Sequence, residues 1–102
     1  MDRKEFIKNE INQDPMDPFN HYLLGIEYQK EGAFEESLKQ FEMIVSKFPE
    51  YVATYYTYAN ALLSANKEDR AEEIIQAGIQ QAEKKGAAKA LKELKQLLEL
   101  NF

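Results

Sequence analysis

The chain has 102 residues, enough for one small domain, and its 18 acidic and 13 basic side chains give a net charge of −5, which argues against binding to nucleic acid or to an anionic membrane surface. Cysteine is absent, which excludes disulfides and thiolate metal sites and fits a reducing compartment. The N-terminal residues are charged and no apolar run is long, so we expect no signal peptide and no membrane span, and we take the cytoplasm as the default location.

Apolar residues recur at helical spacing along the chain, and no segment shows the alternation of a strand. The spacing predicts six helices, over residues 2–12, 18–31, 34–47, 51–65, 68–84 and 87–100. Gly32 and Asn66 tolerate the left-handed backbone that ends a helix. Pro15 and Pro49 follow helices that they could not continue, and Pro18 suits a first turn. Because the connections are so short, neighbouring helices are expected to run antiparallel.

The chain contains an internal repeat with a period of 34 residues. Residues 18–51 and 52–85 share one pattern of size and polarity, in which the small residues Gly25 and Ala59 correspond. Counting back by the same period, residues 1–15 match the second half of a repeat whose first half is missing. The sequence therefore predicts stacked helix pairs.

The repeat resembles the tetratricopeptide repeat, whose 34-residue motif runs Trp-x-x-Leu-Gly-x-x-Tyr, then Ala-x-x-x-Phe, then Pro. The first segment reads His21-x-x-Leu24-Gly25-x-x-Tyr28, Ser37-x-x-x-Phe41 and Pro49. The second reads Tyr55-x-x-Tyr58-Ala59-x-x-Leu62 and Ala71-x-x-x-Ile75, with Glu83 in place of the proline. His21 replaces the usual aromatic residue. The match covers roughly two thirds of the chain directly and, with the flanking helices, nearly all of it.

The resemblance implies an all-α fold, a right-handed α-solenoid of antiparallel helix pairs with about two and a half repeats and a capping helix. We divide this single domain into an N-terminal half-repeat helix, repeat 1, repeat 2 and a capping helix, at residues 1–15, 18–51, 52–85 and 86–102. Gly25 and Ala59 are expected to be small because the partner helix of the same repeat packs directly against them. Gly78 is expected to play the same part toward the following helix.

The last helix departs from the repeat register. A shift of two residues places leucines at its core positions, namely Leu91, Leu94 and Leu98. Lys95 then falls where earlier repeats have Gly25 or Ala59, so this helix should cap the stack with a polar outer face. Leu97 and Leu100 widen its leucine stripe, which fits either a broad contact with the preceding repeat or a surface for a second copy of the chain.

No group of residues suggests catalysis, a metal or a cofactor. His21 is the single histidine, and it takes a repeat position that faces the core, so we expect it to be packed or half-buried. The acidic pair at 35–36 lies in a first turn, where carboxylates favour the helix dipole, and adjacent residues such as 72–73 point apart on a helix. We therefore expect a protein that is not an enzyme.

In the family, the first helix of each repeat lines a concave groove that holds a peptide or helix of a partner. By resemblance, the groove residues of repeat 1 are Phe19, Tyr22, Leu23, Ile26, Gln29 and Lys30, and those of repeat 2 are Ala53, Tyr56, Thr57, Asn60, Leu63 and Ser64. The carboxylate clamp that holds acidic chaperone tails needs lysine and asparagine where this chain has Tyr22, Ile26 and Thr57. Chaperone tails are therefore not expected partners.

The groove is instead aromatic and aliphatic, with Asn60 as an amide for the backbone of a bound peptide. The sequence predicts a non-catalytic scaffold that binds a protein or peptide partner. Two alternatives stay open: a groove closed by the flanking helices, and a small homo-oligomer, such as a homodimer, that uses the groove or the C-terminal helix as its interface.

Overall fold

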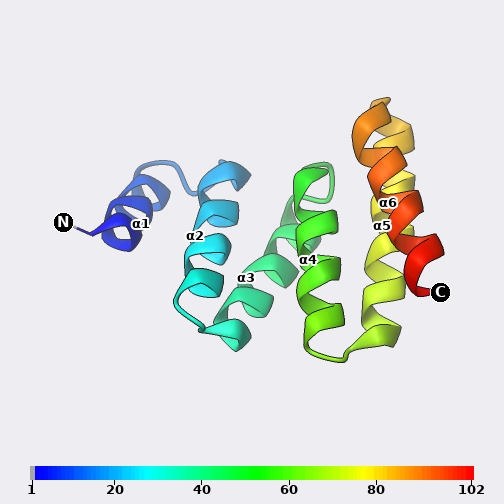
Figure 1. The fold of residues 1–102 in the computed structure, drawn as a ribbon. Helices are drawn as coiled ribbons and strands as arrows, with labels where there is room; N and C mark the ends of the chain where they lie inside the picture. Colours follow the sequence, from blue (N-terminus) through cyan, green and yellow to red (C-terminus); the bar gives the residue numbers. More distant parts are fainter. Residues whose placement is uncertain (1) are drawn as a thin grey trace. The chain divides into compact units, whose positions relative to one another are not determined.

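The computed structural model describes residues 2–102 and folds them into six helices joined by short turns (Figure 1). The helices are α1 (Arg3–Gln13), α2 (Pro18–Lys30), α3 (Phe34–Lys47), α4 (Ala53–Ser64), α5 (Glu68–Lys85) and α6 (Ala88–Asn101). The all-α prediction is confirmed, and each helix begins and ends within two residues of its predicted range. The chain divides into two compact units, residues 1–48 and residues 49–102.

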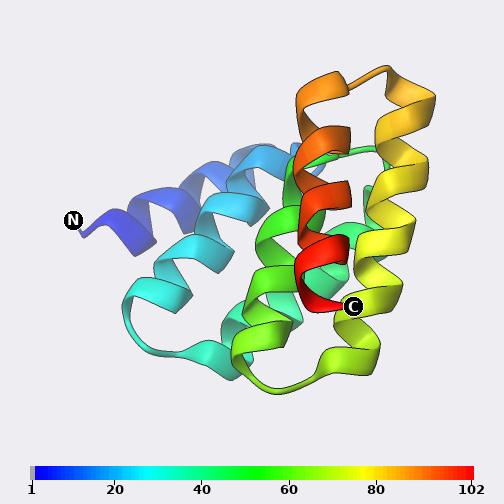
Figure 2. The ribbon, with the colours of Figure 1, turned by 45° about the vertical axis from the view of Figure 1, so that its right-hand side comes forward.

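Within each unit, neighbouring helices run antiparallel and pack as sequential pairs (Figures 1 and 2). In unit 1, α2 contacts both α1 and α3. In unit 2, α5 contacts both α4 and α6, and α6 also touches α4. The division into a half repeat, two repeats and a cap stays a prediction.

Two residues with a left-handed backbone conformation end helices at the positions that the sequence predicted. Gly32 has φ 79° and Asn66 has φ 60°, so both adopt the conformation that closes a helix C-terminus. After Gly32, the Ala33 amide donates to the Tyr28 carbonyl at 2.9 Å, which satisfies one of the last carbonyls of α2. The next helix can therefore begin at once, and this accounts for the short turns.

Gly25 lies at the close contact between α2 and α3. A Cβ atom added to Gly25 would lie 2.5 Å from Cε1 of Phe41, whose side chain is fully buried. The expectation that the partner helix packs directly on this glycine is confirmed. Ser37, on the facing helix, is buried, and its hydroxyl donates to the Phe34 carbonyl at 2.8 Å.

Gly78 packs against one more helix than expected. A Cβ atom added there would lie 2.6 Å from Cβ of Tyr55 on the preceding helix α4, and 3.0 Å from Cδ1 of Leu94 on the following helix α6. The expectation that Gly78 serves the following helix was therefore incomplete. The physical reason is that α5 packs against two helices, and the glycine accommodates both.

The leucine stripe of α6 is also rotated from the predicted register. Leu94 and Leu97 are buried, whereas Leu91 and Leu98 are half-buried and Leu100 is 84% exposed. The prediction that Leu91 and Leu98 are core residues while Leu97 lies beside the stripe was wrong. Because α6 contacts both α4 and α5, its inward face is centred between Leu94 and Leu97.

Ion pairs join α1 to α2 in unit 1. The Nε atom of Arg3 donates to Oε1 of the buried Glu27 at 2.6 Å, and Lys30 lies 3.4 Å from the same oxygen. Nζ of Lys4 donates to Glu31 at 3.1 Å and lies 5.6 Å from the centre of the Tyr28 ring. These contacts fix the first turns of α1 against the C-terminal half of α2.

The carboxylate of Glu27 should make this attachment dependent on pH. Burial by itself would raise the pKa of Glu27, but the hydrogen bond from Arg3 and the charge of Lys30 outweigh it and lower that pKa. An ordinary glutamate in the unfolded chain has a pKa near 4.3, and above that pH the ionised Glu27 stabilises the folded protein. This stability is lost as the pH falls through the lower pKa that Glu27 has in the folded state.

We therefore expect Glu27→Gln to be less stable than the wild type at neutral pH, with a difference that shrinks below about pH 4. Thermal unfolding of both proteins between neutral and acidic pH measures this difference. A difference that stays constant down to the acid limit would contradict the role of the ionised carboxylate.

Candidate functional site

The exposed face of α2 carries the predicted groove residues of repeat 1. Phe19 is 49% exposed, and the residues that follow it at helical spacing are half-buried, namely Tyr22, Leu23, Ile26 and Gln29. Leu24 and Gly25, on the inward side of the same helix, are buried. The structure therefore places these five predicted residues together along one side of α2.

Tyr22 serves the core of unit 1 as well as this face. Its ring centre lies 6.1 Å from that of Phe41, and the two rings are tilted by 44°. Phe41 is the side chain that covers Gly25, so Tyr22 belongs partly to the α2–α3 contact. Phe19, which is more exposed and makes no such ring contact, is the stronger candidate for contact with a partner.

The exposed face of α4 carries the predicted residues of repeat 2. Tyr56 is 42% exposed, while Thr57, Asn60 and Leu63 are half-buried. Other side chains of the same helix are buried in unit 2, namely Tyr55, Tyr58, Ala59 and Leu62. Tyr55 also donates its hydroxyl to the Pro49 carbonyl at 2.6 Å, and burial raises the pKa of that hydroxyl. The exposed face of α4 therefore belongs to a helix whose other side is packed in the core of unit 2.

Asn60 has less hydrogen-bonding capacity than the sequence indicated. Its Nδ2 atom donates to the Tyr56 carbonyl one turn earlier, at 3.0 Å. The side-chain carbonyl oxygen makes no hydrogen bond to a described residue, so it can accept a backbone N–H of a bound peptide. The local bond also holds the amide in one orientation on the α4 face.

His21 is half-buried, as expected, and its contacts are structural. Its Nε2 atom lies 2.7 Å from the Pro15 carbonyl, which can only accept, so this nitrogen carries the proton. Nδ1 then accepts from the Gln40 amide at 3.4 Å, and the ring stacks on Phe48 at 5.8 Å. His21 thus holds the α1–α2 loop to α2 and α3, beside a shallow pocket that Lys8, Asn12 and Met43 help to line.

Within residues 2–102, we find no cluster of three or more histidine, aspartate or glutamate side chains that could hold a metal ion. The helices in this part of the chain are too short or too polar to cross a membrane.

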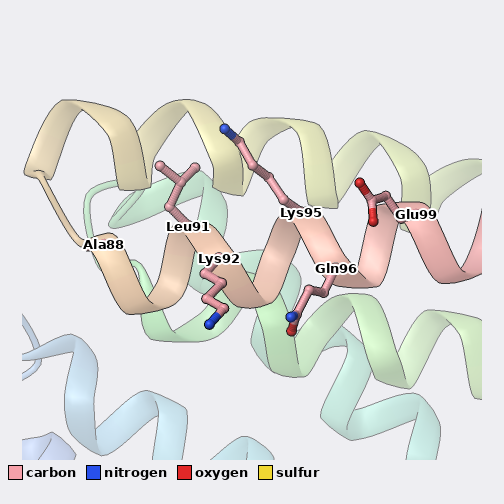
Figure 3. Close-up of a pocket in the computed structure, with 6 residues that line it drawn as sticks. All are labelled: Ala88, Leu91, Lys92, Lys95, Gln96 and Glu99. Carbon is pink, nitrogen blue, oxygen red and sulfur yellow. The ribbon is translucent and has the colours of Figure 1, made fainter.

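The outer face of α6, which the sequence predicted to be polar, carries a second surface feature (Figure 3). A shallow pocket there is lined by Ala88, Leu91, Lys92, Lys95, Gln96 and Glu99. Lys92 and Gln96 point to one side of the helix, and Leu91 and Lys95 to the other (Figure 3). The lining residues follow the spacing of one helix face, at positions 88, 91, 92, 95, 96 and 99, and such a face suits contact with a second helix. This spacing is the signal from which the pocket could have been predicted.

Comparison with known proteins agrees with the repeat pattern. The family model for the tetratricopeptide repeat matches residues 28–97. A tetratricopeptide repeat domain protein from Salinibacter ruber, solved by NMR, has 33% sequence identity and a TM-score of 0.82, over 86% of this chain and 89% of that chain. No curated protein matches the sequence.

Two further solved structures are similar. A crystal structure of a Salinibacter ruber tetratricopeptide repeat domain protein has 32% identity and a TM-score of 0.79, over 83% of this chain and 94% of that chain. A Bordetella parapertussis protein with a solution structure has 18% identity and a TM-score of 0.78, over 97% of this chain and 86% of that chain. The latter likeness concerns the fold alone.

Proposed function

Because the chain belongs to the tetratricopeptide repeat family, whose members are generally protein-interaction modules, we propose that it binds a peptide or short helix of a partner protein. The proposed binding surface comprises the exposed faces of α2 and α4, and the proposed role is non-catalytic. The absence of cysteine suits a reducing compartment, and we propose the cytoplasm as its location.

The observation that carries this proposal is the exposure of aromatic side chains on the first helices of repeats 1 and 2. Phe19 leaves 49% and Tyr56 leaves 42% of its surface in water. Large aromatic side chains of this kind are enriched among the residues that dominate binding energy at protein interfaces. Neighbouring half-buried aliphatic residues on each face, including Leu23 and Leu63, would add apolar contact.

The chemistry of these faces also indicates the kind of segment bound. The positions that would clamp a terminal carboxylate hold Tyr22, Ile26 and Thr57, none of which carries a positive charge. A segment with aromatic or aliphatic anchors suits them better than an acidic tail. The carbonyl oxygen of Asn60 would accept one backbone N–H of that segment.

A peptide-display selection tests this proposal. We expect the wild-type protein to enrich peptides with spaced apolar residues, and Phe19→Ser or Tyr56→Ser to weaken their binding at least about tenfold, equal to 1.4 kcal/mol. Phe34→Ser is the matched control, because Phe34 is 62% exposed but lies on α3. This control should bind like the wild type.

Two outcomes would count against the proposal. If selected peptides bound both α2 and α4 variants as tightly as the wild type, the binding surface would lie elsewhere. If the control weakened binding as much as the two test variants, general surface hydrophobicity would explain the enrichment. Melting temperatures near that of the wild type would show that the variants are folded.

A further inference from the structure

The pocket on α6 has an apolar end and a positively charged middle. Its two side-chain rows, four residues apart, are Ala88–Lys92–Gln96 and Leu91–Lys95–Glu99. Ala88 and Leu91 form the apolar end, and Lys92 and Lys95 follow one turn later. Both lysines are exposed, and neither forms an ion pair with a described residue.

The exposed face of α1 has the complementary pattern. Phe6 is 56% exposed although the next residue, Ile7, is buried, so Phe6 lies outside the contact between α1 and α2. Asp2 lies one turn before Phe6 and Glu10 one turn after it, while Glu5 is adjacent. Neither glutamate forms an ion pair with a described residue, so acidic groups frame an exposed aromatic ring.

We propose that α1 of one copy of the chain binds in the α6 pocket of a second copy. Phe6 covers Ala88 and Leu91, and Glu10, one turn later, pairs with Lys92 and Lys95. The spacing fits because both helices rise about 5.4 Å per turn. In this arrangement the two helices run parallel, because Glu10 follows Phe6 along α1 as the lysines follow Ala88 and Leu91 along α6.

This contact joins two different surfaces, so every copy offers one of each to its neighbours. Such a heterologous contact forms rings or open chains rather than a symmetric pair. One helix laid on another buries an area at the low end of stable interfaces, so we expect weak association that is visible only at high protein concentration. The proposal is independent of the peptide-binding function.

Solution mass by light scattering over a dilution series tests the contact. At concentrations on the order of 0.5 mM, the mass should rise to at least twice the 11.9 kDa of one chain, and salt of about 0.5 M should lower it. Lys92→Glu/Lys95→Glu and Glu5→Lys/Glu10→Lys should each stay monomeric, because each places like charges opposite one another. Mixed in equal amounts, the two variants should associate again.

The matched controls separate this contact from general effects of surface charge and surface hydrophobicity. Lys39→Glu/Lys47→Glu makes the same charge change on exposed residues of α3, and it should associate like the wild type. Phe6→Ser should abolish association, whereas Phe34→Ser should not. Circular dichroism confirms that each variant is helical.

Three results would each overturn the proposal. The first is a wild-type protein that stays monomeric at the highest concentration. The second is association that persists in the Lys92→Glu/Lys95→Glu variant. The third is a mixture of the two charge-reversed variants that remains monomeric, because the restored opposite charges would then have no effect.

Discussion

Gly25→Leu is expected to lower the free energy of unfolding by about 3 kcal/mol and the melting temperature by more than about 10 °C. The reason is overpacking: even a Cβ atom at this position would lie 2.5 Å from Cε1 of Phe41. Phe41 is fully buried and lies beside Tyr22, so its ring has little room to withdraw. Leucine would force α2 and α3 apart, and thermal unfolding followed by circular dichroism measures the cost.

A double-mutant cycle isolates this cause. Phe41→Ala alone should destabilise the protein by about 3–5 kcal/mol because it leaves a cavity. Combined with Gly25→Leu, it should cost clearly less than the sum of the two single changes, since the leucine enters the space of the lost ring. Strict additivity, or a Gly25→Leu protein with the wild-type melting temperature, would contradict the contact described for Gly25.

Gly78→Ala is expected to have the second large effect on stability. Whether it stabilises or destabilises the protein distinguishes helix propensity from packing. Alanine is favoured over glycine within a helix by about 1 kcal/mol, so propensity alone predicts a more stable protein. Packing predicts the opposite, because the new methyl group would lie 2.6 Å from Cβ of Tyr55. That atom is attached directly to the α4 backbone, so the helix itself would have to move.

We therefore expect Gly78→Ala to be destabilised by about 2 kcal/mol in spite of the better helix propensity. Chemical denaturation at equilibrium gives the difference. Gln76→Leu, at an exposed position on the same helix, serves as a control for added volume and should unfold close to the wild type. A higher stability for Gly78→Ala would show that α5 does not approach α4 as closely as described.

Much of the fold follows from local sequence signals. The 34-residue period, the small residues at 25 and 59 and the left-handed stops at Gly32 and Asn66 predicted the helix pairs and their turns. These signals are reliable because each reflects a steric requirement at one position. A bulky residue at Gly25, or a β-branched residue at Gly32, could not adopt the local geometry.

Features that depend on more than one neighbouring helix were harder to predict. The partners of Gly78 and the buried leucines of α6 both depend on a helix that contacts two others, which a single periodic pattern does not reveal. The pairing of Arg3 with Glu27 joins residues 24 positions apart and has no local signature.

The candidate site was predictable in part. The resemblance to the family supplied the predicted residues of the α2 and α4 faces, and their helical spacing agrees with it. It did not indicate that Tyr22 also packs on Phe41, or that Asn60 uses an N–H within its own helix.

The most direct test of the peptide-binding account is NMR titration of the isotope-labelled protein with a peptide from the display selection. The account predicts that backbone amide shifts change most along α2 and α4, around Phe19 and Tyr56, and that changes in α1 and α6 are small. Shifts concentrated on α6, or spread evenly over the chain, would contradict the proposed binding surface.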